Sequence, residues 1–134
     1  MDEPIELTPI GAVRSPLTDP AAAPKQGHEG APDAWVVFEP WALEGLDGIA
    51  PGDDVLLLTW LHRGRRDVLR VHPRDDVTNP ERGVFSTRSA DRPNPLGLHP
   101  VRVLAVEGDR LHVRGLEAVD GTPVVDVKPV LRPG

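Results

Sequence analysis

The chain has 134 residues and a formal net charge of −6, and its length suits one domain with its own core, which we expect to span residues 1–134. It contains no cysteine, which excludes disulfides and any metal site or nucleophile built on cysteine. The N-terminus lacks the basic and apolar leader of a signal peptide, and no apolar run approaches the ~20 residues of a membrane span, so we expect a cytoplasmic protein.

The elements predicted along the chain are mostly short strands. One short helix is expected at residues 40–46, where a proline lies in the first turn and Gly45 favours termination. Residues 16–33 and 89–100 are rich in proline and are expected to form long loops. In chain order, the predicted strands are residues 5–13, 34–38, 54–61, 66–72, 83–87, 101–105, 111–113 and 124–127.

The clearest local pattern is a hairpin in the last third of the chain. Val101, Val103 and Ala105 alternate inward, residues 107–110 form the turn, and residues 111–113 return. No helix is predicted between successive paired strands, which argues against a doubly wound α/β fold. The predicted fold class is therefore mainly β: a small, antiparallel-dominated β-barrel with one short helix and long proline-rich loops.

Several common catalytic motifs are missing from the sequence. It has no glycine-rich dinucleotide or phosphate loop and no G-x-S-x-G nucleophile motif, so phosphoryl transfer and serine hydrolysis lack support. The five histidines are scattered without metal-ligand spacing, and we predict no metal site.

Residues 83–98 hold the most informative pattern. Arg92 and Asn94 each precede a proline, which restricts both to extended backbone. A loop stiffened in this way loses little entropy when a ligand binds, so the two side chains are candidate ligand contacts. The alternative is a rigid proline turn in which Arg92 pairs with Asp91 or with another neighbour.

Other polar positions also admit a structural or a functional interpretation. Asp120 either caps the turn that it forms with Gly121 or holds a hydroxyl or amino group of a ligand. His62 ends an apolar strand as a ligand contact or as a satisfied polar terminus. Asp126 and Lys128 share one face of a strand and are expected to form an ion pair.

Four motifs, in order, resemble the TsaA-like, or TrmO-type, methyltransferase family. They are I-G-A-V-R-S-P from residue 10, P-K-Q from residue 24, G-V-F-S-T-R-S-A-D-R-P-N-P-L-G-L from residue 83, and D-G-T-P-V-V-D-V-K-P from residue 120. The resemblance covers residues 10–130. It implies a small β-barrel that forms homodimers, binds S-adenosylmethionine at its rim, and methylates N6 of threonylcarbamoyladenosine beside the tRNA anticodon.

The resemblance also implies roles for individual residues. Arg88 is suited to hold the carboxylate of the cofactor's methionine, and Leu98 to pack on its adenine. His62 and Asp120 are the candidate catalytic bases, and no metal is implied. The implied cofactor contacts are Pro24, Lys25, Gln26, His62, Arg63, Arg88, Leu98, Asp120, Gly121 and Thr122. The expected substrate contacts are Arg14, Arg65, Arg66, Arg92 and Asn94.

The charge distribution leaves the methyl acceptor open. Nine arginines and five acidic residues lie between Arg63 and Arg102, so this segment is basic although the whole chain is acidic. A tRNA acceptor predicts that Arg65, Arg66, Arg70 and Arg74 face the nucleic acid. The acidic balance favours instead a small-molecule or natural-product acceptor. A third hypothesis is a non-catalytic module that binds S-adenosylmethionine without turnover.

Overall fold

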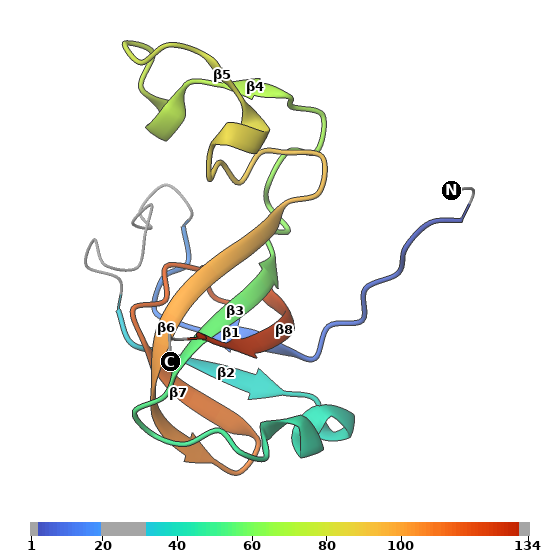
Figure 1. Ribbon diagram of the computed structural model, residues 1–134, viewed down its shortest axis with the longest axis vertical. Coiled ribbons are helices and arrows are strands. Elements are labelled where there is room, and N and C mark those ends of the chain that lie inside the picture. The colour runs from blue at the N-terminus through green and yellow to red at the C-terminus, as the bar shows by residue number, and fades with distance from the viewer. Residues whose placement is uncertain (1–2, 20–31, 132–134) are drawn as a thin grey trace.

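Six antiparallel strands close into a barrel at the centre of the computed structural model, which describes residues 3–19 and 32–131 (Figure 1). Around the barrel the strand order is β1-β2-β7-β6-β3-β8. The predicted antiparallel barrel is thus confirmed. The strands are β1 (Gly11–Arg14), β2 (Ala34–Phe38), β3 (Asp54–Trp60), β6 (Leu96–Glu107), β7 (Arg110–Arg114) and β8 (Pro123–Pro129).

Apolar side chains from every strand of the barrel fill its interior. Burial alternates along β2 and β3, so that Val36 and Leu57 have no exposed surface while their neighbours are half-buried. Closure leaves no free edge in this sheet, which removes a site for unwanted strand pairing. The fully buried core residues are Val13, Val36, Leu57, Val103, Leu111, Val113, Leu116 and Val124.

Strand β6 is the longest element and departs from the predicted alternation. It pairs with β3 through residues 96–102 and with β7 through residues 102–107. The register shifts between Val103 and Ala105, as in a β-bulge. Ala105 is consequently only half-buried, whereas Val106 packs against the core.

Several predicted boundaries are wrong outside the barrel. Residues 5–10 form no strand, and the strand predicted at 66–72 shrinks to β4 (Arg70–Val71). The strand predicted at 83–87 is β5 (Arg82–Gly83) followed by the 3₁₀-helix η5 (Val84–Ser86). In this segment the hydroxyl and the amide of Thr87 both donate hydrogen bonds to the carbonyl oxygen of Val84. These local bonds take the place of hydrogen bonds to a neighbouring strand. Residues 96–100, predicted as loop, belong to β6.

A small extension sits on one end of the barrel, where β3 ends and β6 begins (Figure 1). It contains the two-stranded sheet β4–β5, the 3₁₀-helix η4 (Pro73–Asp75) and η5. The helix predicted at residues 40–46 forms as the 3₁₀-helix η3 (Pro40–Leu46), near the opposite end. None of the helices in the described residues is long and apolar enough to span a membrane.

Candidate functional site

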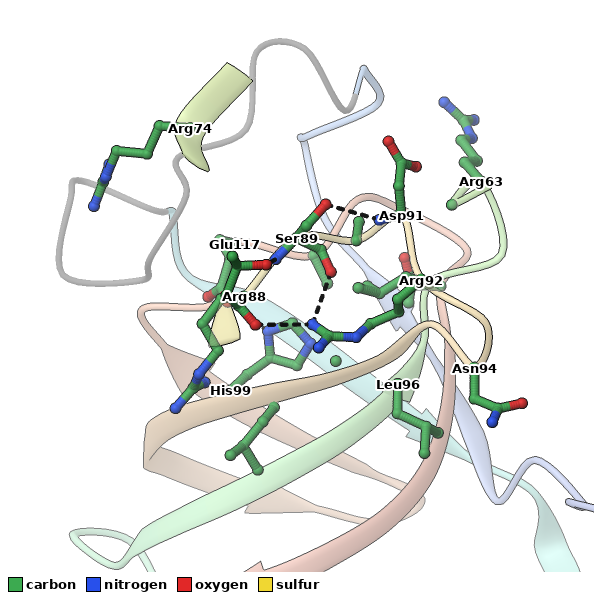
Figure 2. Close-up of a pocket in the computed structure, with 18 of the residues that line it drawn as sticks. Arg63, Arg74, Arg88, Ser89, Asp91, Arg92, Asn94, Leu96, His99 and Glu117 are labelled. Atoms are coloured by element: carbon green, nitrogen blue, oxygen red, sulfur yellow. Dashed lines mark hydrogen bonds and ion pairs between the residues drawn. The ribbon is translucent and has the colours of Figure 1, made fainter. Parts of the chain in front are cut away.

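A cleft of about 1230 Å³ lies where the extension meets the barrel (Figure 2). The start of β6 forms one wall, the loop of residues 61–64 and the segment of residues 85–92 form others, and residues 117–119 close the barrel side. The cleft gathers seven of the expected cofactor and substrate contacts, which are His62, Arg63, Arg88, Arg92, Asn94, Leu98 and Thr122. Arg74, which was expected to face nucleic acid, also lines it.

Arg92 organises the loop that walls the cleft. Its guanidinium donates hydrogen bonds to the carbonyl oxygens of Ser89 at 3.0 Å and Thr87 at 3.1 Å (Figure 2). It also donates to the carbonyl oxygen of Val84 at 2.7 Å. Asp91 does not pair with it and instead accepts a bond from the Arg65 amide at 2.8 Å. Arg92 therefore holds the shape of a rigid turn, and it also lines the cleft, where it was expected to contact substrate.

Two loops are tied together beneath this turn. The amide of Leu61 donates to Pro95 O at 2.7 Å, and the amide of Arg92 donates to Arg65 O at 2.8 Å. Arg66 donates to Pro93 O at 2.7 Å and to the side chain of Asn94 at 3.2 Å. Arg66 thus braces the loop from outside the cleft, while Asn94 lines the cleft itself.

Arg88 and several apolar side chains also line the cleft, and the Arg88 side chain holds no loop in place through hydrogen bonds in the described structure. Arg88 is exposed and has no ion-pair partner among the described residues. Leu96 and Leu98 are 43% and 39% exposed, and Phe85 is 80% exposed. A cationic fork beside exposed apolar groups is suited to a ligand that carries both a carboxylate and a ring.

The turn at Asp120 faces the first strand instead of the cleft. The Asp120 carboxylate accepts a hydrogen bond from the Ser15 amide at 3.0 Å, and its own amide donates to Leu17 O. Gly121 has a φ of +83° and donates to Val13 O at 2.8 Å. Thr122 lines the cleft but is buried, with its hydroxyl bonded to the Val119 carbonyl at 2.7 Å.

The remaining candidates are distributed around the molecule. His62 is exposed in the cleft, and Arg63 donates to Thr18 O at 3.0 Å. Arg14 is exposed at the end of β1 and does not line the cleft. Asp126 and Lys128 form the predicted ion pair at 3.3 Å. Pro24, Lys25 and Gln26 lie outside the described residues.

Ion pairs neutralise part of the basic segment that was expected to face nucleic acid. Arg65 pairs with Asp67 at 3.0 Å, and Arg70 pairs with Glu81 at 2.7 Å. The hydrogen bond between Arg65 and Asp67 raises the pKa of the guanidinium and lowers the pKa of the carboxyl group. These pairs lower the positive potential that a polyanion meets at Arg65 and Arg70.

The sequence analysis missed a buried polar array in the cleft wall. His99 Nε2 lies 2.7 Å from the Thr59 hydroxyl, and His99 Nδ1 lies 2.6 Å from Glu117 Oε1. The side chains of His99 and Glu117 are 4% and 12% exposed, and both residues line the cleft. Glu117 Oε2 is buried and has no hydrogen-bond partner in the described structure.

Two sequence signals point to this array. His99 occupies an inward position of the alternating series Gly97, His99, Val101 and Val103. Glu117 interrupts an apolar run of residues 116–119. A titratable group at an inward position needs a partner, and two such groups on one barrel suggest that they find each other.

Comparisons with known proteins agree with the geometry. The model of a family described as the tRNA-methyltransferase O N-terminal domain matches residues 12–133. A probable S-adenosyl-L-methionine-binding protein of Methanothermobacter thermautotrophicus is 44% identical over 96% of this chain and 91% of its own length. An S-adenosyl-L-methionine-binding protein of Archaeoglobus fulgidus is 45% identical over 91% of this chain and 86% of its own.

A solved structure shares the same fold. The crystal structure of TrmO from Pseudomonas aeruginosa superposes with a TM-score of 0.76 and 31% sequence identity. The match covers 96% of this chain but only 55% of the TrmO chain. This chain therefore spans about half the length of that protein.

Proposed function

Because the chain belongs to the family of the tRNA-methyltransferase O N-terminal domain, we propose that it methylates N6 of threonylcarbamoyladenosine beside the anticodon of tRNA. The cofactor is S-adenosylmethionine, the molecule that two of the curated relatives are named for binding. The observation that carries the proposal is the cleft, in which an exposed arginine and exposed leucines face the same space.

The residues of the cleft fit this cofactor. Arg88 presents parallel N–H donors that suit the carboxylate of S-adenosylmethionine, and Leu96 and Leu98 offer apolar surface to the adenine of the cofactor. The volume of about 1230 Å³ exceeds the roughly 300–1,000 Å³ of a typical small-molecule site, which leaves space for part of an acceptor. When bound, S-adenosylmethionine supplies an activated methyl group on a sulfonium, so the protein mainly has to align the acceptor and exclude water.

The contacts to tRNA belong at the cleft, where Arg74 and Arg82 are exposed lining residues. Both lie close enough to the site to bind phosphates of a nucleic acid whose modified base enters the cleft. Arg65, Arg66, Arg70 and Arg74 were all expected to face the nucleic acid. Of these four, Arg74 lines the cleft, whereas Arg65 and Arg70 lie outside it and form ion pairs with Asp67 and Glu81.

A small-molecule acceptor is the second candidate function. It is favoured by the net charge of −6 and by the ion pairs that neutralise arginines of the basic segment. In this case the same cofactor site and the same cleft serve a smaller substrate.

Transfer of a labelled methyl group separates these candidates. Purified chain and labelled S-adenosylmethionine are incubated with tRNA that carries threonylcarbamoyladenosine, with tRNA that lacks it, and with a metabolite extract. Label in the first tRNA alone is the expected result. Label only in a compound from the extract would favour the small-molecule function. Cofactor binding without transfer to any of the three would contradict enzymatic activity and favour a binding module.

A further inference from the structure

The buried array of Thr59, His99 and Glu117 has a function that the cofactor site does not explain. We propose that Glu117 accepts the proton that the methyl acceptor loses, so that the acceptor is an N–H group. This inference rests on the proposed function. His99 and Thr59 are positioning residues that hold the carboxylate toward the cleft.

The order of the three groups shows which of them lies at the cleft. A hydroxyl, an imidazole and a carboxylate stand in the same order as in the triads of hydrolases, where the hydroxyl attacks the substrate. Here Thr59 has no exposed surface and does not line the cleft. Glu117, at the other end, does line it. The end of the array that lies at the cleft is therefore the carboxylate residue, and not the hydroxyl.

Only one oxygen of this carboxylate is satisfied. Oε1 accepts a bond from His99 Nδ1 at 2.6 Å, whereas Oε2 is buried and has no partner among the described residues. Leaving a buried acceptor unpaired costs free energy, so a native structure tends to retain it where a ligand uses it. An N–H group of an acceptor in the cleft supplies the missing donor.

The hydrogen bonds of His99 are consistent with an ionised Glu117. In the tautomer with the proton on Nδ1, the Nδ1–H group donates a hydrogen bond to Glu117 Oε1. Nε2 then carries a lone pair that accepts a hydrogen bond from the Thr59 hydroxyl. Gly97 pairs with Thr59 across the two strands, and a Cβ at Gly97 would overlap with Thr59 Oγ1 and His99 Nε2. A glycine at position 97 therefore leaves the space that the contact between Thr59 and His99 needs.

The other candidate bases are less well placed. The Asp120 carboxylate is bonded to the Ser15 amide, and Asp120 does not line the cleft. His62 lines the cleft but is exposed, and no described residue orients its ring. Of these three residues, Glu117 is the one that combines a cleft position, a fixed orientation and a buried oxygen without a partner in the described structure.

The proposed step balances. The acceptor nitrogen forms a bond to the methyl carbon, the bond between that carbon and the sulfonium sulfur breaks, and its electron pair stays on sulfur as S-adenosylhomocysteine leaves. The N–H proton moves to Glu117 Oε2, so the neutral methylated product forms without a free cation in the cleft. The proton then passes to solvent when the product leaves.

The test compares Glu117→Gln with the wild-type protein. The amide keeps the volume and still accepts a bond from His99 through its oxygen, but it does not take up a proton. Because a positioned base typically contributes about 10²–10⁴-fold, kcat for methyl transfer to tRNA should fall at least about 100-fold. The Kd for S-adenosylmethionine, measured by calorimetry, should change less than threefold. Glu107→Gln, an exposed carboxylate at the end of β6, is the matched control and should leave both unchanged.

Chemical rescue distinguishes a proton acceptor from a residue with only a structural role, because a small carboxylate in solution replaces only the former. Formate should raise the rate of Glu117→Ala, which leaves space for a carboxylate, but not that of Glu117→Gln. The rescue of Glu117→Ala also answers the question if the glutamine variant fails to fold. For the positioning role, His99→Asn retains an N–H donor toward Glu117 and should keep at least tenfold more kcat than His99→Leu, at equal cofactor affinity.

Several outcomes would overturn the inference. If the wild-type protein methylates tRNA and Glu117→Gln keeps kcat within threefold, Glu117 is not the proton acceptor, although the proposed function stands. If Glu117→Gln loses cofactor affinity more than tenfold, Glu117 is a cofactor contact instead. If the wild-type protein transfers no methyl group to tRNA, the proposed function fails, and this inference fails with it.

Discussion

The two arginines at positions 88 and 92 show how neighbouring residues of one motif take different roles. Arg92 uses three of its five N–H donors on carbonyl oxygens of its own loop. Arg88 is exposed in the cleft and forms no ion pair among the described residues. The loop therefore uses one arginine to hold its shape and presents the other.

Replacing Arg88 by alanine should weaken S-adenosylmethionine binding without changing stability. Charge-assisted hydrogen bonds contribute about 1.5–3 kcal/mol, which corresponds to a Kd increase of roughly 10- to 100-fold. The midpoint of thermal unfolding should stay within about 2 °C, because Arg88 is exposed. Calorimetry measures the affinity, with Arg114→Ala on the barrel surface as the control. Equal affinity in both variants would contradict the assignment of Arg88.

At the scale of elements, predictions were best where a strand or helix is defined by its own residues. Strand β2 and helix η3 form over the predicted ranges, since alternation and a proline in the first turn are local signals. Strand β4 and helix η5 departed from prediction because they lie outside the barrel. There the backbone is arranged by loop contacts, such as the bond from Arg92 to Val84 O, and not by a sheet ladder.

The pairing of β3 with β6 depends on a glycine at one position. A Cβ at Gly97 would overlap with Thr59 Oγ1 and His99 Nε2, both buried. Gly97→Ala should therefore lower the free energy of unfolding by about 1–3 kcal/mol, as measured by urea denaturation. Gly45→Ala is the matched control, since nothing lies within 4 Å of a Cβ there. An unchanged midpoint for Gly97→Ala would show that the strands can move apart at no cost.

At the scale of the whole molecule, the net charge is an average over regions of opposite sign, so it does not identify the acceptor by itself. The acidic average of −6 conceals a basic segment, and folding then pairs several of its arginines with nearby carboxylates. Other arginines of the segment, including Arg74, Arg82 and Arg88, line the cleft. The potential that a substrate meets is decided by this local arrangement.

We propose that the protein is a homodimer, as the resemblance to its family implies. Exposed apolar side chains next to β4 and η4, including Leu69 and Val77, offer surface that a second copy would cover. Light scattering after size exclusion should give twice the 14.5 kDa mass of one chain at micromolar concentration. A mass of one chain over the whole concentration range would contradict the proposal, and a shift with dilution would give the dissociation constant.

The amino-acid sequence by itself determined the barrel class, most of its strands and the family, because alternation and contiguous motifs are properties of neighbouring residues. It also led to Arg88 and Leu98, which lie in the cleft. Only the tertiary structure decided that Asp120 faces Ser15, 105 positions away, and that His99 joins Thr59 and Glu117 across separations of 40 and 18 residues. Such contacts depend on how the barrel closes, and closure is a property of the whole chain that no local pattern contains.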